Sequence, residues 1–248
     1  MALDKNSNAF TFGFALVMVV VVGAVLSSLA MGLKPLQLKN QADKKRIDIL
    51  TAIDVDANRT NAAELFDKYV VERVVIDYDG NIISSNTGEV DALDDKDAFN
   101  INIRAEYRDR SIKPEERNYP FYKCDKDGKT LYVIPMIGNG LWGAIWGFVA
   151  LEDDFNMVYG ASFDHATETP GLGAEISLPM FQDPFKGKQI LDDQGNYKSI
   201  EVKKGGAEAG NPHQVDGITG GTITSDGVTE MLQRTLKVYH RFFNKNNA

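Results

Sequence analysis

Hydrophobic and polar residues are unevenly distributed along this chain, and the longest apolar run comes first. No charged residue occurs between Ala9 and Leu33, a stretch of 25 residues. As a helix with a rise of ~1.5 Å per residue it would be about 37 Å long, enough for a hydrocarbon core of ~30 Å with some tilt. We therefore predict a transmembrane helix over residues 9–33 after a short tail, residues 1–8. The competing interpretation is a signal peptide with a cleavage site at Ser28-Leu29-Ala30, but no basic segment precedes the run.

The pattern after this run predicts a connector and one mixed domain. We expect Pro35 to break the helix, so that residues 34–53 form a juxtamembrane helix or connector. Residues 54–248 are predicted to form a single α+β domain. Its expected elements are a helix over 62–70, strands on either side of the Asp79-Gly80 and Gly138-Asn139-Gly140 turns, strands over 159–164 and 197–202, and a helix from Ser225 onward capped by Ser225 or Asp226. Residues 86–118 and 165–187 are expected to be loops, each with a short helix at most.

Charge separates the same regions. The formal net charge is −8, but the tail is neutral, residues 34–50 carry five basic and two acidic side chains, and the remaining 198 residues carry 21 basic and 32 acidic ones. The basic collar suits lipid headgroups. The acidic domain argues against nucleic-acid binding, which needs a basic face. The single cysteine, Cys124, excludes an internal disulfide and cysteine-built zinc or iron–sulfur sites within the chain.

Several short patterns resemble binding motifs but are better explained as turns. Gly138-x-Gly140-x-x-Gly143 matches a dinucleotide fingerprint by letter, yet the residues that follow predict a strand where the fingerprint requires a helix. Asp77-x-Asp79-Gly80 and Asp125-x-Asp127-Gly128 lack the remaining ligands of a calcium loop. The three histidines are scattered along the chain. We therefore predict no metal site.

The segment from Asp216 to Ser225, DGITGGTITS, is the first candidate binding element. It is a glycine- and hydroxyl-rich turn that leads into the C-terminal helix. Free N–H groups and the helix dipole favour a phosphate at such a place. Gly220 and Gly221 would let the backbone approach closely, and a hydroxyl there could be esterified. The alternative is an ordinary Ser/Thr-rich helix cap.

Two further segments contain residues suited to a planar heteroaromatic ligand. The loop His165-Ala166-Thr167-Glu168-Thr169-Pro170-Gly171-Leu172-Gly173 combines exposed backbone N–H groups, a carboxylate and a flat apolar side chain. It could equally be a plain strand-to-helix connection. In the segment 140–147, GLWGAIWG, Trp146 is expected in the core, whereas Trp142 could either fill the core or form a pocket wall.

In combination, these segments carry a specific resemblance. GNGLWGAIWGFVALEDD, HATETPGLGAEI and DGITGGTITSDGV, in this order after one N-terminal membrane helix, resemble the C subunits of the sodium-translocating NADH:quinone oxidoreductases. The resemblance extends along nearly the whole chain to YHRFF. The G subunit of the Rnf complex shares the flavin-binding domain, but the GLW segment and the chain length favour the C-subunit family. The implied fold is α+β: one N-terminal transmembrane helix followed by a single mixed α+β FMN-binding domain, with the covalent FMN-binding region over 130–248.

The resemblance implies an FMN held by a phosphoester. In the family, a flavin transferase esterifies a threonine in a pattern like Asp-x-x-Ser/Thr-Gly-Ala-Thr, which predicts Thr222 as the attachment residue and leaves Thr224 as the alternative. Gly221 stands where the family commonly has alanine. No catalytic acid–base pair is assigned. The candidate cofactor-binding residues are Trp142, Glu168, Thr169, Gly171, Leu172, Gly173, Asp216, Thr219, Gly220, Gly221 and Ser225.

The role implied is that of an electron carrier in a larger complex. Its expected partners are the other membrane subunits, the flavin transferase and the lipid bilayer of a bacterial inner membrane, with the soluble domain on the periplasmic side. The charge pattern disagrees, because one basic residue before the helix and five after it favour a cytoplasmic domain. The alternatives are an Rnf-type subunit, a stand-alone flavinylated reductase, and a membrane-anchored extracytoplasmic ligand sensor without covalent flavin.

Overall fold

The computed structural model describes residues 7–246, so most of the predicted tail, residues 1–8, lies outside the described residues. The chain divides into two compact units, Met1–Lys44 and Lys45–Ala248. Helix α1, Asn8–Ala52, begins in the first unit and ends in the second. It contains a segment long and apolar enough to cross a membrane. The expected break at Pro35 is wrong, since the helix continues through it. A proline removes one backbone hydrogen bond and can kink a helix without ending it.

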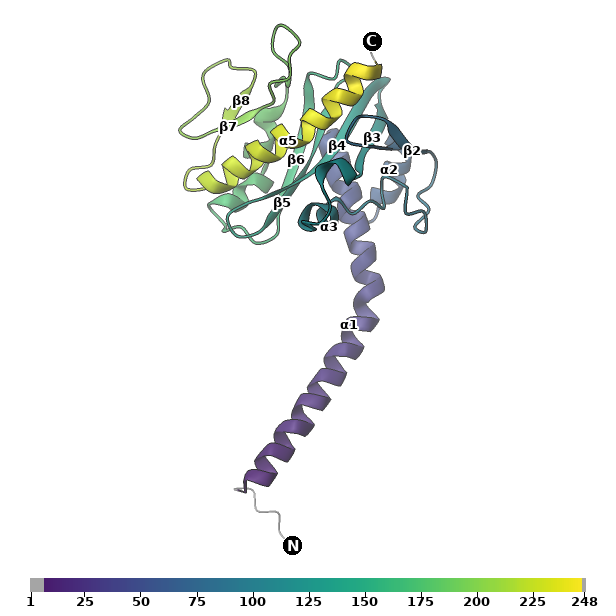
Figure 1. The fold of residues 1–248 in the computed structure, drawn as a ribbon, viewed down its shortest axis with the longest axis vertical. Coiled ribbons are helices and arrows are strands. Elements are labelled where there is room, and N and C mark those ends of the chain that lie inside the picture. The colour runs from purple at the N-terminus through teal and green to yellow at the C-terminus, as the bar shows by residue number, and fades with distance from the viewer. Residues whose placement is uncertain (1–6, 247–248) are drawn as a thin grey trace. The chain divides into compact units, whose positions relative to one another are not determined.

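The second unit is built on a six-stranded antiparallel sheet with strand order β2-β1-β3-β4-β5-β6 (Figure 1). The strands are β1 Val70–Ile76, β2 Ile82–Asn86, β3 Tyr119–Lys126, β4 Lys129–Asn139, β5 Ala144–Leu151 and β6 Val158–His165. Strands β1, β2, β4, β5 and β6 lie in segments for which the sequence predicted strands. Strand β3 was not predicted, although it pairs with both β1 and β4 at the centre of the sheet.

Helix α5, Thr222–Asn246, lies across one face of the sheet (Figure 1). The apolar residues of α5 that follow a 3.6-residue period are all buried: Val228, Met231, Leu232, Leu236, Tyr239 and Phe243. Burial of each large apolar side chain contributes roughly 1.5–3 kcal/mol. This apolar stripe therefore holds the helix on the sheet and fixes where its first turn lies.

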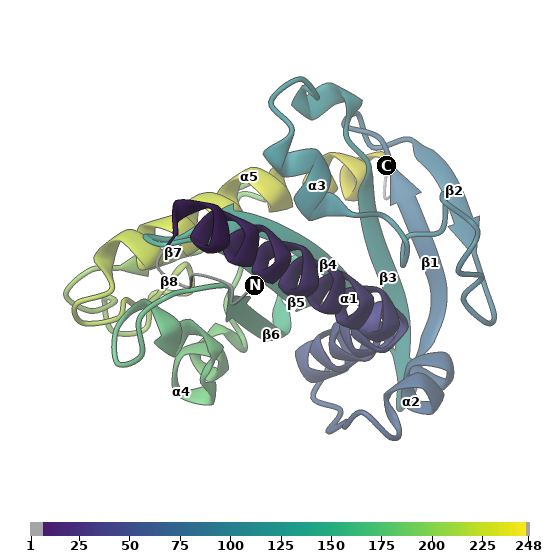
Figure 2. The same ribbon diagram turned by 90° about the horizontal axis from the view of Figure 1, so that it is seen from below.

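The opposite face of the sheet is covered by the last turns of α1 and by α2, Ala62–Tyr69 (Figure 2). Ile49, Leu50 and Phe66 are fully buried. The Phe66 ring centroid lies 6.1 Å from that of Tyr122 on β3, whereas the neighbouring Phe121 packs on the α5 side. This alternation along β3 is what a strand buried on both faces requires.

The remaining elements are short. They are α3 Ile103–Arg108, the 3₁₀ turns η1 Pro114–Glu116, η2 Gly173–Ser177 and η3 Asp183–Phe185, α4 Pro179–Gln182, and the parallel pair β7 Glu201–Lys203 and β8 Gln214–Asp216. Only the end of the strand expected over 197–202 is confirmed. Strand β8 was missed, because three residues are too few to show a period.

Two predicted boundaries are wrong near the candidate binding segments. Helix α5 begins at Thr222 rather than at Ser225. Ser225 and Asp226 therefore do not cap it, and the Ser225 hydroxyl instead accepts the Ile218 N–H at 3.2 Å. Strand β4 runs through Gly138 and Asn139, so the turn lies at residues 140–143. The residues after that turn form β5, as the sequence predicted in place of a helix.

Candidate functional site

A cleft of about 200 Å³ lies where the three candidate segments meet. It is formed by the turn 140–143 between β4 and β5, the loop that follows β6, and the first turn of α5 with the residues just before it. The lining residues are Leu141, Trp142, Glu168, Thr169, Leu172, Gly173, Gly220, Gly221, Thr222, Ile223 and Thr224. Segments about 80 residues apart in the sequence thus contribute to one cavity.

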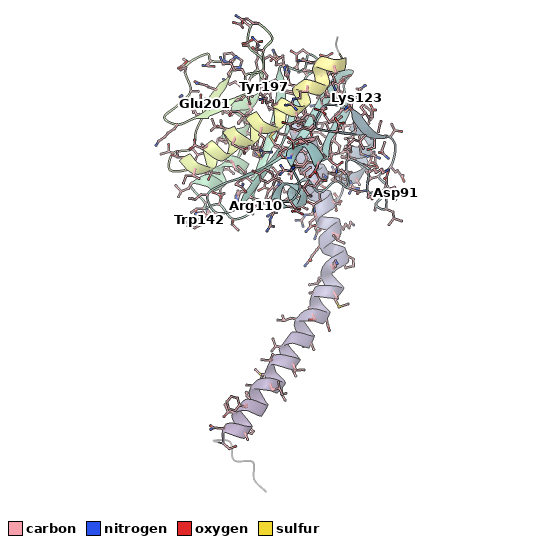
Figure 3. All side chains as sticks on the ribbon, viewed as in Figure 1. Asp91, Arg110, Lys123, Trp142, Tyr197 and Glu201 are labelled. Atoms are coloured by element: carbon pink, nitrogen blue, oxygen red, sulfur yellow. The ribbon has the colours of Figure 1, made fainter. Side chains whose placement is uncertain are left out.

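The turn 140–143 presents apolar side chains at the mouth of the cleft. The Gly140 N–H donates to the Gly143 carbonyl at 2.8 Å, which closes the turn. Trp142 is 66% exposed and projects from the end of the domain where α5 begins (Figure 3). Trp142 therefore forms a cavity wall rather than part of the core. Trp146 is half-buried, with the Arg104 guanidinium 5.6 Å from its ring centroid.

Glu168 forms the polar end of the cleft, and its side chain is buried. One carboxylate oxygen accepts the Trp142 N–H at 2.8 Å and the other accepts the Thr224 hydroxyl at 2.6 Å. Burial by itself would raise the pKa of Glu168, but the hydrogen bonds from Thr224 and from the backbone of residues 141–143 outweigh it, so that the pKa is lowered. The carboxylate is therefore ionised at neutral pH.

The first turn of α5 places two threonines on the cleft. Thr222 is partly exposed, whereas Thr224 is only 1% exposed and its hydroxyl is bonded to Glu168. The N–H groups of residues 222–224 belong to the first helical turn, which has no intrahelical acceptors for them. An anion at this position would meet free donors and the positive end of the helix dipole.

Four predicted cofactor-binding residues do not line the cleft: Gly171, Asp216, Thr219 and Ser225. The Asp216 carboxylate accepts the Ala207 N–H at 2.7 Å and so stabilises a neighbouring loop. Two lining residues, Leu141 and Ile223, were missed. Both are apolar yet 48% and 55% exposed. The only sequence signal that these two residues line the cleft is that Leu141 precedes Trp142 and Ile223 follows Thr222.

Two other cavities are less suited to a planar ligand. One of about 350 Å³ lies between the loops around Asp192 and Asn211 and is lined mainly by polar and charged residues. One of about 30 Å³ lies beside Tyr107 and Arg234. In residues 7–246, no group of three or more His, Cys, Asp or Glu side chains is arranged to hold a metal ion.

Comparison with known proteins agrees with this geometry. Residues 140–237 match the family model of the FMN-binding domain, a range that contains every lining residue of the cleft. The C subunit of the Na(+)-translocating NADH-quinone reductase of Vibrio alginolyticus is 34% identical over 92% of this chain and 90% of its own length. The chain belongs to the family of these C subunits. The C subunit of the same reductase in Neisseria meningitidis serogroup B is 33% identical over 91% of this chain and 88% of its own length.

The structure of this chain also resembles a solved structure of the same family. The crystal structure of the C subunit from Parabacteroides distasonis matches with a TM-score of 0.72 at 36% identity, and covers 85% of this chain and 96% of that chain. The resemblance read from the three sequence segments is therefore confirmed. So is the fold class, an N-terminal apolar helix followed by a mixed α+β FMN-binding domain.

Proposed function

We propose that this chain is the C subunit of a Na⁺-translocating NADH:quinone reductase and relays electrons through an FMN joined to Thr222 by a phosphoester. The observation that carries the proposal is the cleft in which the three FMN-domain segments meet at the start of α5. The family assignment favours this function over a ligand sensor or an Rnf-type subunit.

The residues of the cleft fit a flavin mononucleotide. Leu141, Trp142, Leu172 and Ile223 supply apolar surface for a flat ring, while Thr169 supplies a polar group for its edge and Glu168 lines the polar end of the cleft. The cavity, about 200 Å³, is smaller than the ~300–1,000 Å³ typical of sites that enclose a ligand. One edge of the flavin would therefore stay open, as a carrier that exchanges electrons with neighbouring centres requires.

The exposure and direction of the two threonine side chains support Thr222 as the attachment residue. Thr222 is partly exposed beside the free N–H groups of the first turn, where a phosphate is stabilised. Thr224 is buried and its hydroxyl donates to Glu168. In the esterification, the Thr222 oxygen bonds to the flavin phosphorus, loses its proton and displaces the leaving group of a phosphoanhydride-activated flavin nucleotide supplied with the transferase. A threonine hydroxyl needs such activation.

When bound, the flavin supplies the capacity to accept and donate single electrons. The chain's own residues bind and orient it. The first turn of α5 would hold the phosphate, the Trp142 and Leu172 side chains would shield the ring from water, and the ester would prevent the loss of the carrier by dissociation.

We also propose that residues 9–33 span a bacterial inner membrane once, that residues 34–53 form a juxtamembrane helix whose last turns, from Lys45 onward, pack in the folded unit, and that residues 54–248 form the periplasmic domain. The apolar helix α1 and the relatives, which are subunits of a reductase complex, support the membrane span. The periplasmic side of the domain is part of the proposal and is tested by a reporter experiment. The partners would be the other membrane subunits and, during maturation, the flavin transferase.

Flavin fluorescence in a denaturing gel tests the attachment. After co-expression with a flavin transferase, we expect a fluorescent wild-type band and complete loss of fluorescence in Thr222→Ala, because the ester oxygen is gone. Thr222→Ser keeps a hydroxyl and is the matched control, expected to remain fluorescent. A dark wild-type band would overturn the covalent FMN, and a bright Thr222→Ala band would move the attachment to another residue.

A further inference from the structure

The three segments of the cleft are joined by a single side chain. Through its two carboxylate oxygens, Glu168 accepts the Trp142 N–H at 2.8 Å and the Thr224 hydroxyl at 2.6 Å. Glu168 itself belongs to the loop after β6, Trp142 to the β4–β5 turn, and Thr224 to α5. Within the described loop 165–173, Glu168 is thus the only residue whose side chain forms hydrogen bonds to both of the other two segments.

Two glycines leave the space that this carboxylate occupies. A Cβ atom at Gly140 would lie 2.6 Å from one Glu168 oxygen, and a Cβ atom at Gly173 would overlap the other oxygen as well as the Thr224 hydroxyl. Any other residue at either position would displace the carboxylate. The Glu168 side chain is therefore buried in a space that these two glycines leave open, and it is not a surface charge that happens to lie nearby.

We propose that Glu168 is a positioning residue: it ties the β4–β5 turn to the first turn of α5, and it engages Thr224 so that Thr222 alone presents a hydroxyl to the flavin phosphate. The inference rests on the proposed function of this cleft and deepens it. Glu168 takes no part in the phosphoryl transfer itself.

The geometry of the helix explains the selection. Residues two apart on an α-helix point in directions about 200° apart, so Thr222 and Thr224 cannot both face the solvent. Thr224 is the one that points inward, where its hydroxyl meets an ionised carboxylate and forms a charge-assisted hydrogen bond. Loss of that bond would free the Thr224 hydroxyl and loosen the turn that carries Thr222.

Hydrogen exchange of the full-length, flavin-free chain tests the tie directly. Such a hydrogen bond contributes ~1.5 kcal/mol, so its loss should speed amide exchange in segments 140–145 and 222–226 by roughly tenfold. We expect this acceleration in Thr224→Val and in Glu168→Gln, and wild-type exchange in Thr224→Ser, which restores the hydroxyl. Thr235→Val, a buried threonine of α5 away from the cleft, is the control and should leave both segments unchanged.

Peptide mass spectrometry after co-expression with the transferase tests the selection. We expect a several-fold lower flavin content at Thr222 in Thr224→Val, with recovery in Thr224→Ser. We also expect flavin at Thr224 in the double variant Thr222→Ala/Glu168→Gln, but none in Thr222→Ala.

The outcomes separate the two proposals. Unchanged exchange in Thr224→Val, or no recovery in Thr224→Ser, would overturn the role of Glu168. A wild-type chain without flavin would overturn the proposed function, while the exchange rates would still decide whether Glu168 ties the segments. If Glu168→Gln fails to fold, the pair Thr224→Val and Thr224→Ser remains decisive, because valine keeps the branched shape of threonine without its hydroxyl and serine keeps the hydroxyl in a smaller side chain.

Discussion

Among single residues, the buried pair of Arg73 and Asp97 is the clearest case in which one side chain stabilises a long irregular segment. The Arg73 guanidinium donates to Asp97 at 2.8 Å and to the Gly88 and Glu89 carbonyls, and both side chains of the pair are 1% exposed. A buried charge that loses its partner is strongly destabilised. Arg73 therefore anchors the 88–97 loop on strand β1.

We expect Arg73→Met to lower the free energy of unfolding by ~3–5 kcal/mol, because it leaves the Asp97 carboxylate buried without its counter-charge. Lys203→Met is the matched control. It removes the exposed pair with Glu201, whose side chains are 42% and 43% exposed, and such a pair contributes at most ~1 kcal/mol. Urea unfolding of the full chain in detergent measures both. Equal midpoints for the two variants would contradict the anchoring role.

The sequence predicted single residues unevenly for a physical reason. Glu168 and Leu172, which line the cleft, belong to a segment whose composition already suited a ligand, whereas Thr222 was predicted from the family resemblance. The Glu168–Thr224 hydrogen bond joins residues 56 positions apart, and the Arg73–Asp97 pair bridges a loop without any period. Such pairs depend on how elements pack, so a local pattern carries no signal for them.

At the level of elements, the position of α5 depends on one glycine. A Cβ atom at Gly227 would overlap the carbonyl oxygen of Asn139, at the end of β4. Helix and strand can therefore approach closely only if this position has no side chain. Gly227 lies five residues after Thr222, about one and a half turns further along the helix. This contact therefore also sets the distance between the first turn of α5 and the sheet.

Gly227→Ala should destabilise the domain although alanine is the better helix former. The gain in helix propensity is ~1 kcal/mol, while the overpacked contact costs ~1–3 kcal/mol and displaces the start of the helix. We expect a lower melting temperature and a lower flavin content at Thr222. Lys237→Ala, on the exposed side of the same helix, should change neither. An unchanged melting temperature in Gly227→Ala would show that α5 does not need this close contact.

Elements with a clear period were predicted well, and those defined by long-range pairing were not. The stripe from Val228 to Phe243 fixed the face of α5, and the alternation around Gly80 fixed the β1–β2 hairpin. The start of α5 was misplaced by three residues, because TIT lacks the apolar period of the later turns. Strand β3 was missed because it directly follows a polar loop. It pairs with β1, which precedes that loop in the sequence, and with β4, which follows it.

At the scale of the whole molecule, the basic collar acquires two different roles. Lys45 and Arg46 belong to the folded second unit: the Lys45 ammonium donates to the Phe99 carbonyl at 2.8 Å, and the Arg46 guanidinium lies 4.9 Å from the Phe99 ring centroid. Burial, opposed in part by Asp97, lowers the pKa of Lys45 to about 8. The collar counted from the sequence therefore includes two residues that serve the packing of the domain.

The other basic residues of the collar, Lys34, Lys39 and Lys44, still favour a cytoplasmic domain and so oppose the proposed orientation. A reporter experiment decides between the two orientations. Positive charge near a helix end favours the cytoplasm, but large domains translocate largely regardless of charge. We expect alkaline phosphatase fused after Ala248 to be active, because its disulfides form in the periplasm, and green fluorescent protein at the same position to be dark. The same reporters fused before Met1 should give the opposite result. If alkaline phosphatase fused after Ala248 were inactive and green fluorescent protein at the same position were fluorescent, the domain and its flavin cleft would lie in the cytoplasm.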